Sequence, residues 1–507
     1  MIKKAVMFFS SMLFSMFLFL VPVSAAEADY DGAVLTAEGF SEPYVLSDGS
    51  ERSHTLTEAG GSVTITREDG ISFLYIVFDR IPEKWTLTDI SDGTQADCGE
   101  NSYLHEYVDV SSKLGSTPET VRLDFPAGTS IDEIYAFGEG DIPDWVQRWS
   151  PPCEQADLLL LSSHADDEQL FFAGVLPMYA GERGLNVQVV YLVNHFYNAE
   201  YERVCRPHEQ LDGLWTVGVR NYPVMSDFPD LYSESFDGAL AAYVWYGFEY
   251  NDFTEYITGV LRRFKPLVVV SHDVNGEYGH GTHVLCTAAL MDSIVSAADE
   301  TEYPESAELY GTWETEKTYL HLYPENPLTL DLDTPLSAFD GKTAFQVSQD
   351  GFAKHTSQHW TYFYGWMYGK NGQAVTRASD IRIWSPCYYG LYSTSVGYDT
   401  AGGDFMENIV PYAERYTEEP EVEEVEDTTE DGEPENSETT ANEPEGSNEE
   451  TTADEADVTD SADMTDSAEA SSAPNSVLTL LIAVIAASAL AAAIISIIVV
   501  RLRRRKK

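Results

Sequence analysis

The sequence predicts an α/β domain around a mostly parallel β-sheet, preceded by a β-sandwich and followed by a C-terminal transmembrane helix. Three observations predict this arrangement. Apolar runs alternate with helical stretches in residues 152–416, short strands fill residues 27–151, and a long uncharged stretch lies near the C-terminus. Buried strands that alternate with helices are typical of a parallel sheet. Short strands separated by turn residues are typical of a sandwich.

The composition excludes one class of partner. The 507 residues include 85 Asp and Glu against 29 Lys and Arg, a formal net charge of −56. A nucleic-acid binder needs a basic surface for the phosphates, so we predict no nucleic-acid partner. Because 43% of the residues are hydrophobic, the chain can build a sizeable core, and its length suits two or three domains.

Residues 1–26 have the layout of a secretory signal peptide. Lys3 and Lys4 precede an apolar run, and small residues follow at 23–26. This order is typical of a cleaved export signal, with an uncleaved anchor as the alternative. Export would place the five cysteines in an oxidising compartment. Their odd number and their spacing predict no disulfide framework.

Three segments follow the predicted domains. Residues 417–475 form an acidic stalk with 23 Asp and Glu and no Lys or Arg, which we expect to be extended and disordered. Residues 476–500 are uncharged and long enough to span a bilayer. Residues 501–507 contain six cations, and such a cluster marks the cytoplasmic side. We therefore expect a single-pass cell-membrane protein with an extracellular body and a cytoplasmic C-terminus.

The predicted sandwich, residues 27–151, has its clearest strands at 62–66 and 72–78. Its last strand, 131–138, resembles the last strand of galactose-binding-like sandwiches, without a decisive motif. One hypothesis is glycan binding at an exposed Trp85 or Tyr103. The alternative is an accessory domain with a purely structural role.

The α/β domain, residues 152–416, contains three apolar runs that predict buried strands. Between them lie stretches that predict helices, and residues 310–416 are expected to extend the same domain. The predicted strands are 157–162, 187–193 and 267–271, and the predicted helices are 168–182, 200–217, 253–264 and 282–298.

Polar clusters follow two of these strands. The first reads His-Ala-Asp-Asp-Glu at 164–168, and the second contains several histidines within 272–283. Ligands of open α/β sheets bind beyond the carboxyl ends of the strands, so we expect the clusters to meet. Imidazole and carboxylate groups suit a catalytic Zn²⁺ with a position left for water. A neighbouring carboxylate can take the proton of that water.

These clusters resemble the PIG-L-type (LmbE-like) N-acetylglucosaminyl deacetylase family. Residues 163–168, with Gly174, resemble its H-P-D-D-E motif, and residues 276–283 resemble its G-x-Y-G-H-x-x-H motif. Between them, residues 206–209 resemble the R-x-x-E helix of the family. The motifs follow the family's order over roughly residues 155–300.

The resemblance implies a Rossmann-like α/β fold and Zn²⁺-dependent removal of acetyl groups from N-acetylglucosamine-type amines. By motif position, it implies that His164, Asp167 and His283 are the metal ligands. Fe²⁺ or Co²⁺ would suit the same ligands.

The resemblance also implies catalytic roles. Asp166 would be the general base, and His280 the acid or electrostatic partner of the tetrahedral intermediate. Tyr278 would assist at the oxyanion, and Arg206 would contact substrate or shape the site. The alternative for Arg206 is an ion pair with Glu209, three residues along a helix.

Two positions depart from the family motifs. Ala165 stands where the first motif has proline. This change leaves the ligand side chains intact, so we expect activity to survive. Gly281-Thr282 stand where some members have Pro-Asp. An aspartate there could tune its neighbouring histidine, so its absence bears on the pKa of His280.

The first hypothesis is therefore an extracellular, membrane-anchored, metal-dependent N-deacetylase of amino sugars. The alternatives are an amidase acting on another amide-linked glycoconjugate and a non-catalytic surface protein that binds glycans in adhesion. The expected partner is an N-acetylated glycan or a small amino-sugar conjugate. Outside the signal, stalk and tail, the chain has 62 acids and 21 cations. This charge favours a neutral or cationic substrate over teichoic-acid-like polymers.

Overall fold

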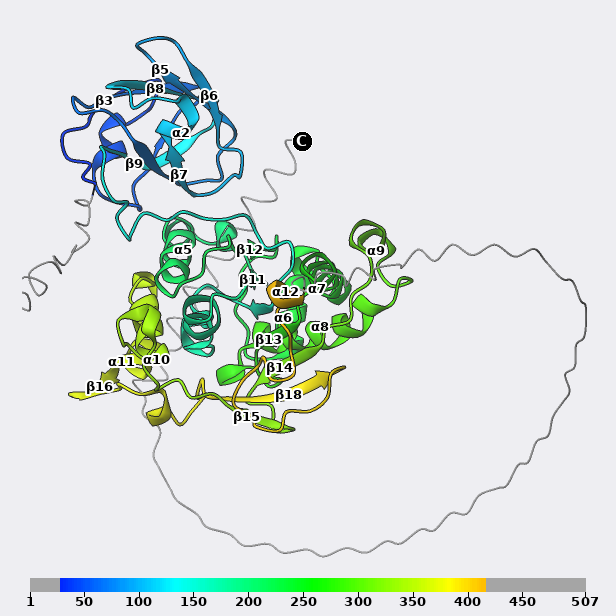
Figure 1. Ribbon diagram of the computed structural model, residues 1–507. Coiled ribbons are helices and arrows are strands. Elements are labelled where there is room, and N and C mark those ends of the chain that lie inside the picture. The colour runs from blue at the N-terminus through cyan, green and yellow to red at the C-terminus, as the bar shows by residue number, and fades with distance from the viewer. Residues whose placement is uncertain (1–27, 416–507) are drawn as a thin grey trace, which may run out of the picture. The chain divides into compact units, whose positions relative to one another are not determined.

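The computed structural model describes residues 28–415, which comprise a β-rich N-terminal region and an α/β region (Figure 1). The predicted signal peptide, stalk, transmembrane helix and cytoplasmic tail lie outside the described residues. All five cysteines lie within them, and each is buried and free.

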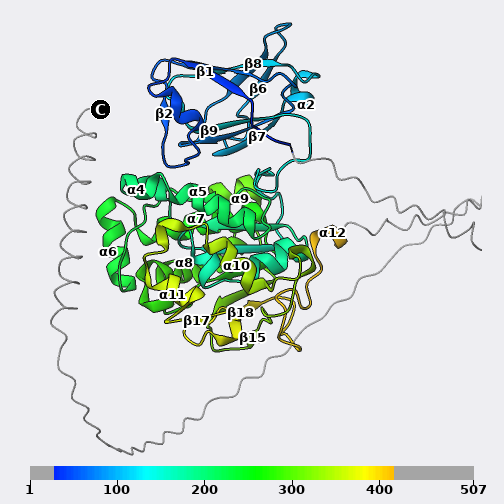
Figure 2. The same ribbon diagram turned by 90° about the vertical axis from the view of Figure 1, so that its left-hand side faces the viewer.

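The N-terminal region contains two antiparallel sheets that form two layers (Figure 2). Apolar side chains of both sheets, such as Ile65 and Leu123 of one and Ile76 and Ile134 of the other, belong to one buried cluster. Burial between two such faces is the physical basis of a sandwich. The first sheet has the order β1 (Val34–Glu38), β3 (Gly61–Thr66), β8 (Thr120–Phe125), β5 (Trp85–Asp89), β6 (Gln95–Cys98). The second has the order β2 (Thr55–Leu56), β9 (Ser130–Phe137), β4 (Phe73–Phe78), β7 (His105–Asp109).

Trp85 and Tyr103 are buried, so the expectation that they are exposed to glycans is wrong. Trp85 is 2% exposed and donates its indole N–H to Glu106 at 2.9 Å. Tyr103 is 6% exposed and stacks on Tyr222, with ring centres 4.3 Å apart. Both rings fill the interior because aromatic side chains contribute large apolar areas to a core.

The α/β region is built on one seven-stranded sheet. Its first five strands in spatial order are parallel, and β18 is antiparallel to both of its neighbours. The mostly parallel sheet is therefore confirmed, and the segment after residue 310 completes it. The order is β12 (Val224–Met225), β11 (Val187–Tyr191), β10 (Leu158–Ser162), β13 (Val268–Ser271), β14 (Lys317–His321), β18 (Tyr388–Thr394), β15 (Pro327–Thr329).

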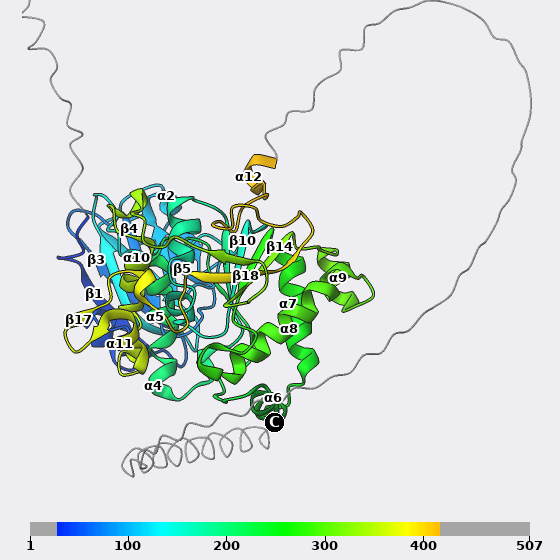
Figure 3. The ribbon, with the colours of Figure 1, turned by 90° about the horizontal axis from the view of Figure 1, so that it is seen from below.

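Helices cover both faces of this sheet (Figure 3). Leu159 and Leu161 of β10 pack in the cluster that holds helices α7 (Tyr250–Phe264) and α8 (Gly281–Ala298). Leu158 and Leu160 pack in the cluster that holds α5 (Arg206–Thr216) and α10 (Ala344–Phe352). Alternate residues of a strand point to opposite faces, so an apolar run is required where both faces are covered.

The remaining helices are α2 (Val110–Leu114), α3 (Asp167–Leu170), α4 (Glu200–Arg203), α6 (Phe236–Tyr246), α9 (Pro304–Tyr310), α11 (Tyr362–Tyr368) and α12 (Tyr412–Arg415). A short hairpin, β16 (Gly369–Lys370) and β17 (Gln373–Ala374), follows α11.

The helix predictions differ from the structure in three places. The stretch 168–182 is broken around Gly174, where φ is +85° and a Cβ would lie 2.7 Å from Leu332. The stretch 200–217 forms two helices, α4 and α5. The region before α7, for which no helix was predicted, contains α6. Tertiary packing decides these differences, which periodicity alone does not reveal.

Within the described residues, α8 is long and apolar enough to cross a membrane. More than half of its apolar window, 56%, is buried inside the fold, and it packs on α6 and α7. The helix is therefore a core element of the α/β region.

Ionisable groups, most of them buried, connect the sandwich with α5. His105 of β7 lies 2.9 Å from His208 through ring nitrogens, and His208 Nε2 lies 3.2 Å from Asp132 Oδ2. Arg52 lies 3.1 Å from Glu209 Oε1. The helix that begins with Arg206 is therefore fixed by the sandwich on its outer side.

Glu51 lies in this network, and its protonation should make stability depend on pH. Burial, and next the charge of Asp212, raise the pKa of Glu51 to about 8, although His208 and Lys354 oppose the shift. A raised carboxyl pKa means that the folded state binds the proton more tightly, so stability falls as pH rises from about 4.5 to 8. We expect Glu51→Gln to raise the melting temperature by about 2–4 °C at pH 8 and to leave it unchanged at pH 4.5. The exposed Glu83→Gln is the control, and equal melting temperatures of Glu51→Gln and wild type at pH 8 would contradict the prediction.

Candidate active site

The two polar clusters lie at adjacent strand ends. Strands β10 and β13 are parallel neighbours, with Leu158 paired to Val268 and Leu160 to Val270. The loop after β10 carries His164, and the loop after β13 leads to His283 in the first turn of α8. Because parallel strands bring their carboxyl ends to one edge, residues more than 100 positions apart meet there.

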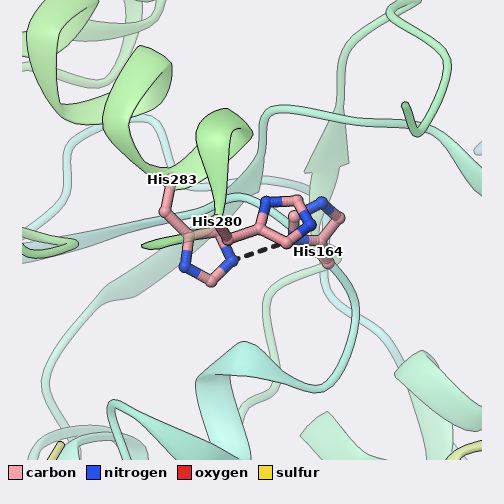
Figure 4. A group of neighbouring side chains, drawn as sticks. All are labelled: His164, His280 and His283. Atoms are coloured by element: carbon pink, nitrogen blue, oxygen red, sulfur yellow. Dashed lines mark hydrogen bonds between the residues drawn. The ribbon is translucent and has the colours of Figure 1, made fainter. Parts of the chain in front are cut away.

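Three ligand-type atoms form a triangle at this edge. His164 Nδ1 lies 3.1 Å from Asp167 Oδ2 and 3.1 Å from His283 Nε2, and His283 Nε2 lies 3.2 Å from Asp167 Oδ2. All three side chains are buried. Figure 4 shows the rings of His164, His280 and His283 gathered at one place.

This donor set fits a divalent cation. His283 Nδ1 donates to Glu277 Oε2 at 2.7 Å, which leaves a lone pair on Nε2 facing the triangle. His164 Nε2 lies 3.4 Å from Asp230 Oδ1, so the lone pair of His164 is on the Nδ1 atom of the triangle. Atoms about 3 Å apart can share an ion at roughly 2.0–2.2 Å from each, the ligand distances of Zn²⁺.

Two further histidines lie near the triangle. His280 can group with His164 and His283, and His272 with Asp167 and His283, their ligand atoms within 4.8 Å of one another. His272 is already engaged, because its Nε2 accepts the Ser163 N–H at 2.9 Å.

Glu277 holds three imidazoles with one carboxylate. It is fully buried and accepts Nδ1–H bonds from His272 at 2.8 Å, His283 at 2.7 Å and His321 at 2.6 Å. Burial opposes its charge, but His272 and the hydrogen bonds of all three histidines hold the pKa of Glu277 well below its usual range. The ionised carboxylate therefore fixes the orientation of His283.

We expect Glu277→Gln to lower the Zn²⁺ affinity of the site roughly 10- to 100-fold, because carboxylates that orient ligand histidines have effects of this size. Glutamine offers one acceptor atom and turns an N–H toward an imidazole N–H. Isothermal titration of metal-free protein with Zn²⁺ measures the change. The exposed Glu314→Gln is the control, and an unchanged affinity in Glu277→Gln would show that His283 needs no such support.

Asp166 lies in the same cavity and is held by Arg206. Its backbone has φ = 118°, which is strained for a residue with a side chain. Arg206 Nη2 lies 3.3 Å from Asp166 Oδ1 and also donates to the Ala165 carbonyl. Burial raises the pKa of Asp166 to about 6 against the opposing charge of Arg206.

Arg206 does not pair with Glu209, so the alternative of a helical ion pair is wrong. Glu209 instead accepts hydrogen bonds from Arg52, from Thr356, and from the backbone and hydroxyl of Ser357. One turn of α5 thus fixes Asp166 on one side and the segment around Ser357 on the other.

His280 and Tyr278 complete this edge of the cavity. His280 Nδ1 accepts the Thr282 N–H at 3.3 Å, so the ring proton is on Nε2. Burial, and next the charges of His164 and His283, lower the pKa of His280 to about 2, so the ring is neutral. Tyr278 has φ = 47° and is 38% exposed, with its ring centre 5.4 Å from that of His280.

The two departures from the family motifs have local explanations. Ala165 keeps the N–H that proline lacks, and donates it to His195 Nε2 at 3.2 Å. Thr282 donates its hydroxyl to the Leu231 carbonyl at 3.1 Å. Some family members have an aspartate beside His283; here the carboxylate that contacts His283 belongs to Glu277.

A cavity of about 200 Å³ opens onto these groups. Six of the seven predicted site residues line it, and His283 is the one that does not. Leu170 lines it as well. Sequence reasoning missed Asp230 and Tyr232, which lie in an irregular loop without a motif. It also missed Gln358, Thr361, Tyr362 and Phe363.

Residues 159–294 match the PIG-L family, described as GlcNAc-PI de-N-acetylase. The resemblance inferred from the three motifs is thereby confirmed. This part of the chain contains β10, β11, β13, α5 and α8, and therefore every predicted site residue.

The chain is also similar to curated proteins and to solved structures. A 1D-myo-inositol 2-acetamido-2-deoxy-alpha-D-glucopyranoside deacetylase of Catenulispora acidiphila is 23% identical over 52% of this chain and 86% of its own. A probable N-acetylglucosaminyl-phosphatidylinositol de-N-acetylase of Schizosaccharomyces pombe is 24% identical over 42% of this chain and 81% of its own. The N,N'-diacetylchitobiose deacetylase of Pyrococcus horikoshii is 14% identical, with 47% of this chain and 84% of that chain covered at a TM-score of 0.34.

Proposed function

We propose that this protein is an extracellular, membrane-anchored, metal-dependent N-deacetylase of N-acetylglucosamine-type amino sugars. The observation that carries the proposal is the triangle of His164 Nδ1, Asp167 Oδ2 and His283 Nε2. Two of its residues, His164 and Asp167, line the same cavity as Asp166. The named relatives act on acetylated glucosamine conjugates, which supports the substrate class.

The three triangle atoms would hold the ion, with Zn²⁺ as the expected metal and Fe²⁺ or Co²⁺ as substitutes. When bound, such an ion polarises a carbonyl and lowers the pKa of water. Asp166 takes a proton from the attacking water, and the water oxygen bonds to the acetamide carbon. Arg206 keeps the Asp166 carboxylate in place for this transfer.

The negative charge then develops on the carbonyl oxygen. His280, protonated on Nε2, donates a hydrogen bond to that oxygen, and Tyr278 contributes its hydroxyl from the same side. Of the two roles expected for His280, a neutral ring suits the electrostatic one. The proton on Asp166 passes to the nitrogen as the C–N bond breaks, which releases acetate and a free amine.

The location rests on the sequence of residues 1–26 and 476–507. The features of a predicted export signal, an apolar span and a basic end support a catalytic body outside the cell. Protease treatment of intact cells tests this arrangement, since an extracellular body is cleaved while a cytoplasmic one survives.

The experiment for the function measures acetate release by the purified full chain, with metal removed and then restored. Acetate that appears from N-acetylglucosamine compounds, disappears with a chelator and returns with Zn²⁺ is the expected result. Retention of N-acetylated glycans without any acetate would favour the non-catalytic adhesion protein. Cleavage confined to other amides would favour the amidase.

A further inference from the structure

Glu168, the last residue of the first motif, is buried beside the predicted base. Its Oε2 accepts the backbone N–H of Asp166 at 2.9 Å. This hydrogen bond helps to hold Asp166 at φ = 118°, a conformation that a residue with a side chain keeps only when its surroundings fix it. Glu168 is 1% exposed, and a buried carboxylate is costly unless a positive charge or further donors face it.

His355 faces the other oxygen of this carboxylate. Its Nε2 lies 3.2 Å from Glu168 Oε1, and both side chains are fully buried. Among the described residues, it is the one basic side chain within 4 Å of Glu168, and neither ring nitrogen has another hydrogen-bond partner there. Burial opposes a charge on His355, but the contact with Glu168 and next the charge of Asp166 raise the pKa of the ring. Glu168 therefore lies between His355 and the backbone of Asp166.

Helix α5 provides the space that His355 occupies. A Cβ on Gly213 would lie 2.8 Å from His355 Nε2, so a larger residue there would displace the ring. Glu209, one turn earlier, accepts the Ser357 N–H at 2.8 Å and holds the segment that follows His355. Residues 206, 209 and 213 are three and four positions apart, so they share one face of the helix. The helix that begins with Arg206 therefore also places His355.

His355 comes from outside the family-matched residues. The match ends at residue 294, and His355 follows α10, which packs beside α3 and α5. The matched part of the chain supplies the buried carboxylate of Glu168, and the later segment supplies its counter-charge. The support of the predicted base is therefore completed by a part of the chain that carries none of the three motifs.

We propose that His355 is a positioning residue for the deacetylation. Its ion pair holds the Glu168 carboxylate, and Glu168 holds the backbone of Asp166, so that the Asp166 carboxylate faces the attacking water. His355 is not among the described residues that line the cavity, so it acts through Glu168 and not on the substrate. This inference rests on the proposed function and adds a residue on which its base depends.

The test compares His355→Gln with wild type as the purified full chain loaded with Zn²⁺, with N-acetylglucosamine and N,N′-diacetylchitobiose as substrates. Glutamine keeps a hydrogen-bond donor but not the charge. We expect kcat to fall roughly tenfold to hundredfold, with KM and Zn²⁺ affinity within about twofold of wild type, because the variant misplaces the base without touching substrate or metal.

His359→Gln is the matched control. His359 lies in the same segment and packs on Phe352, with ring centres 5.8 Å apart, as His355 does at 6.2 Å. The same substitution there removes a ring from Phe352 and leaves the pair with Glu168 intact. We therefore expect the kcat of this control to equal that of wild type.

Glu168→Gln supplies a second variant, which decides the inference if His355→Gln does not fold. It removes the charge that His355 faces, so it should lower kcat to the same extent and retain Zn²⁺. Residues that act through one contact have non-additive effects, so the double variant should lose no more than either single variant.

An unchanged kcat in both single variants would overturn the inference, and so would equal losses in His355→Gln and His359→Gln. Additive losses in the double variant, or a fall in Zn²⁺ affinity as large as the fall in kcat, would also overturn it. If wild type releases no acetate, the deacetylase function fails by itself. Hydrogen–deuterium exchange of residues 164–168 then decides the inference. Faster exchange in His355→Gln than in wild type and His359→Gln supports the positioning role, and equal exchange opposes it.

Discussion

Asp167→Asn should remove the bound metal and reduce acetate release to the level of a reaction without enzyme. Asp167 Oδ2 is the one anionic atom of the triangle and lies within 3.2 Å of both ligand nitrogens. Burial opposes its charge, but His283 and His164 hold the pKa of Asp167 well below its usual range. Asparagine has the same shape without the charge, so a dication would be held by two neutral nitrogens. We expect bound Zn²⁺ to fall from about one per chain to nearly none.

Metal content is measured after dialysis, and circular dichroism checks that the variant folds. The exposed Asp227→Asn controls for a change of charge outside the cavity. His283→Ala supplies a second test, because it removes a different corner of the triangle. A fully metallated and active Asp167→Asn would show that the triangle is not the metal site.

Asp166→Asn should leave metal binding intact and lower kcat by roughly 10²- to 10⁴-fold, the contribution of a positioned general base. This loss corresponds to about 3–5 kcal/mol of transition-state stabilisation. Asp166 contacts Arg206 through Oδ1, and among the described residues it makes no hydrogen bond to the three triangle atoms. The amide can keep the contact to the protein, but it cannot accept the proton of water.

The neighbouring substitutions at 166 and 167 act as controls for each other, since both replace a cavity-lining carboxylate by its amide. The discriminating result is that Asp166→Asn binds metal without turnover, whereas Asp167→Asn neither binds metal nor turns over substrate. If Asp166→Asn loses metal to the same extent as Asp167→Asn, Asp166 is a ligand and the base must be sought elsewhere. Asp230, which lines the same cavity, would then be the next residue to change.

The carboxyl ends of β10 and β13 could be located from the sequence because their signals are local. A buried strand between two helical layers must be apolar on both faces, and Leu158 to Leu161 satisfy this without reference to the rest of the chain. The polar residues after such a run mark the strand end. Their spacing matched the family motifs, which brought His164, Asp166, Asp167 and His283 into one hypothesis.

The sandwich shows where local signals are insufficient. Alternating strands predicted its sheets, yet Trp85 and Tyr103 were expected to be exposed and are buried. Whether one aromatic ring faces solvent depends on which segment packs over it. For Tyr103 that segment includes Tyr222, from the other region of the fold.

By itself, the sequence determined the mostly parallel sheet, the order of the motifs and the residues that suit a metal and a base. The tertiary structure alone decided that Glu277 holds three imidazoles, that Asp230 faces His164, and that Tyr362 lines the cavity. The reason is physical. Periodicity and motif spacing report what neighbouring residues do along one strand or helix. The contacts of Tyr362 with a site built from residues 164–283 depend instead on the anchoring of its segment by Glu209, a contact between residues nearly 150 positions apart.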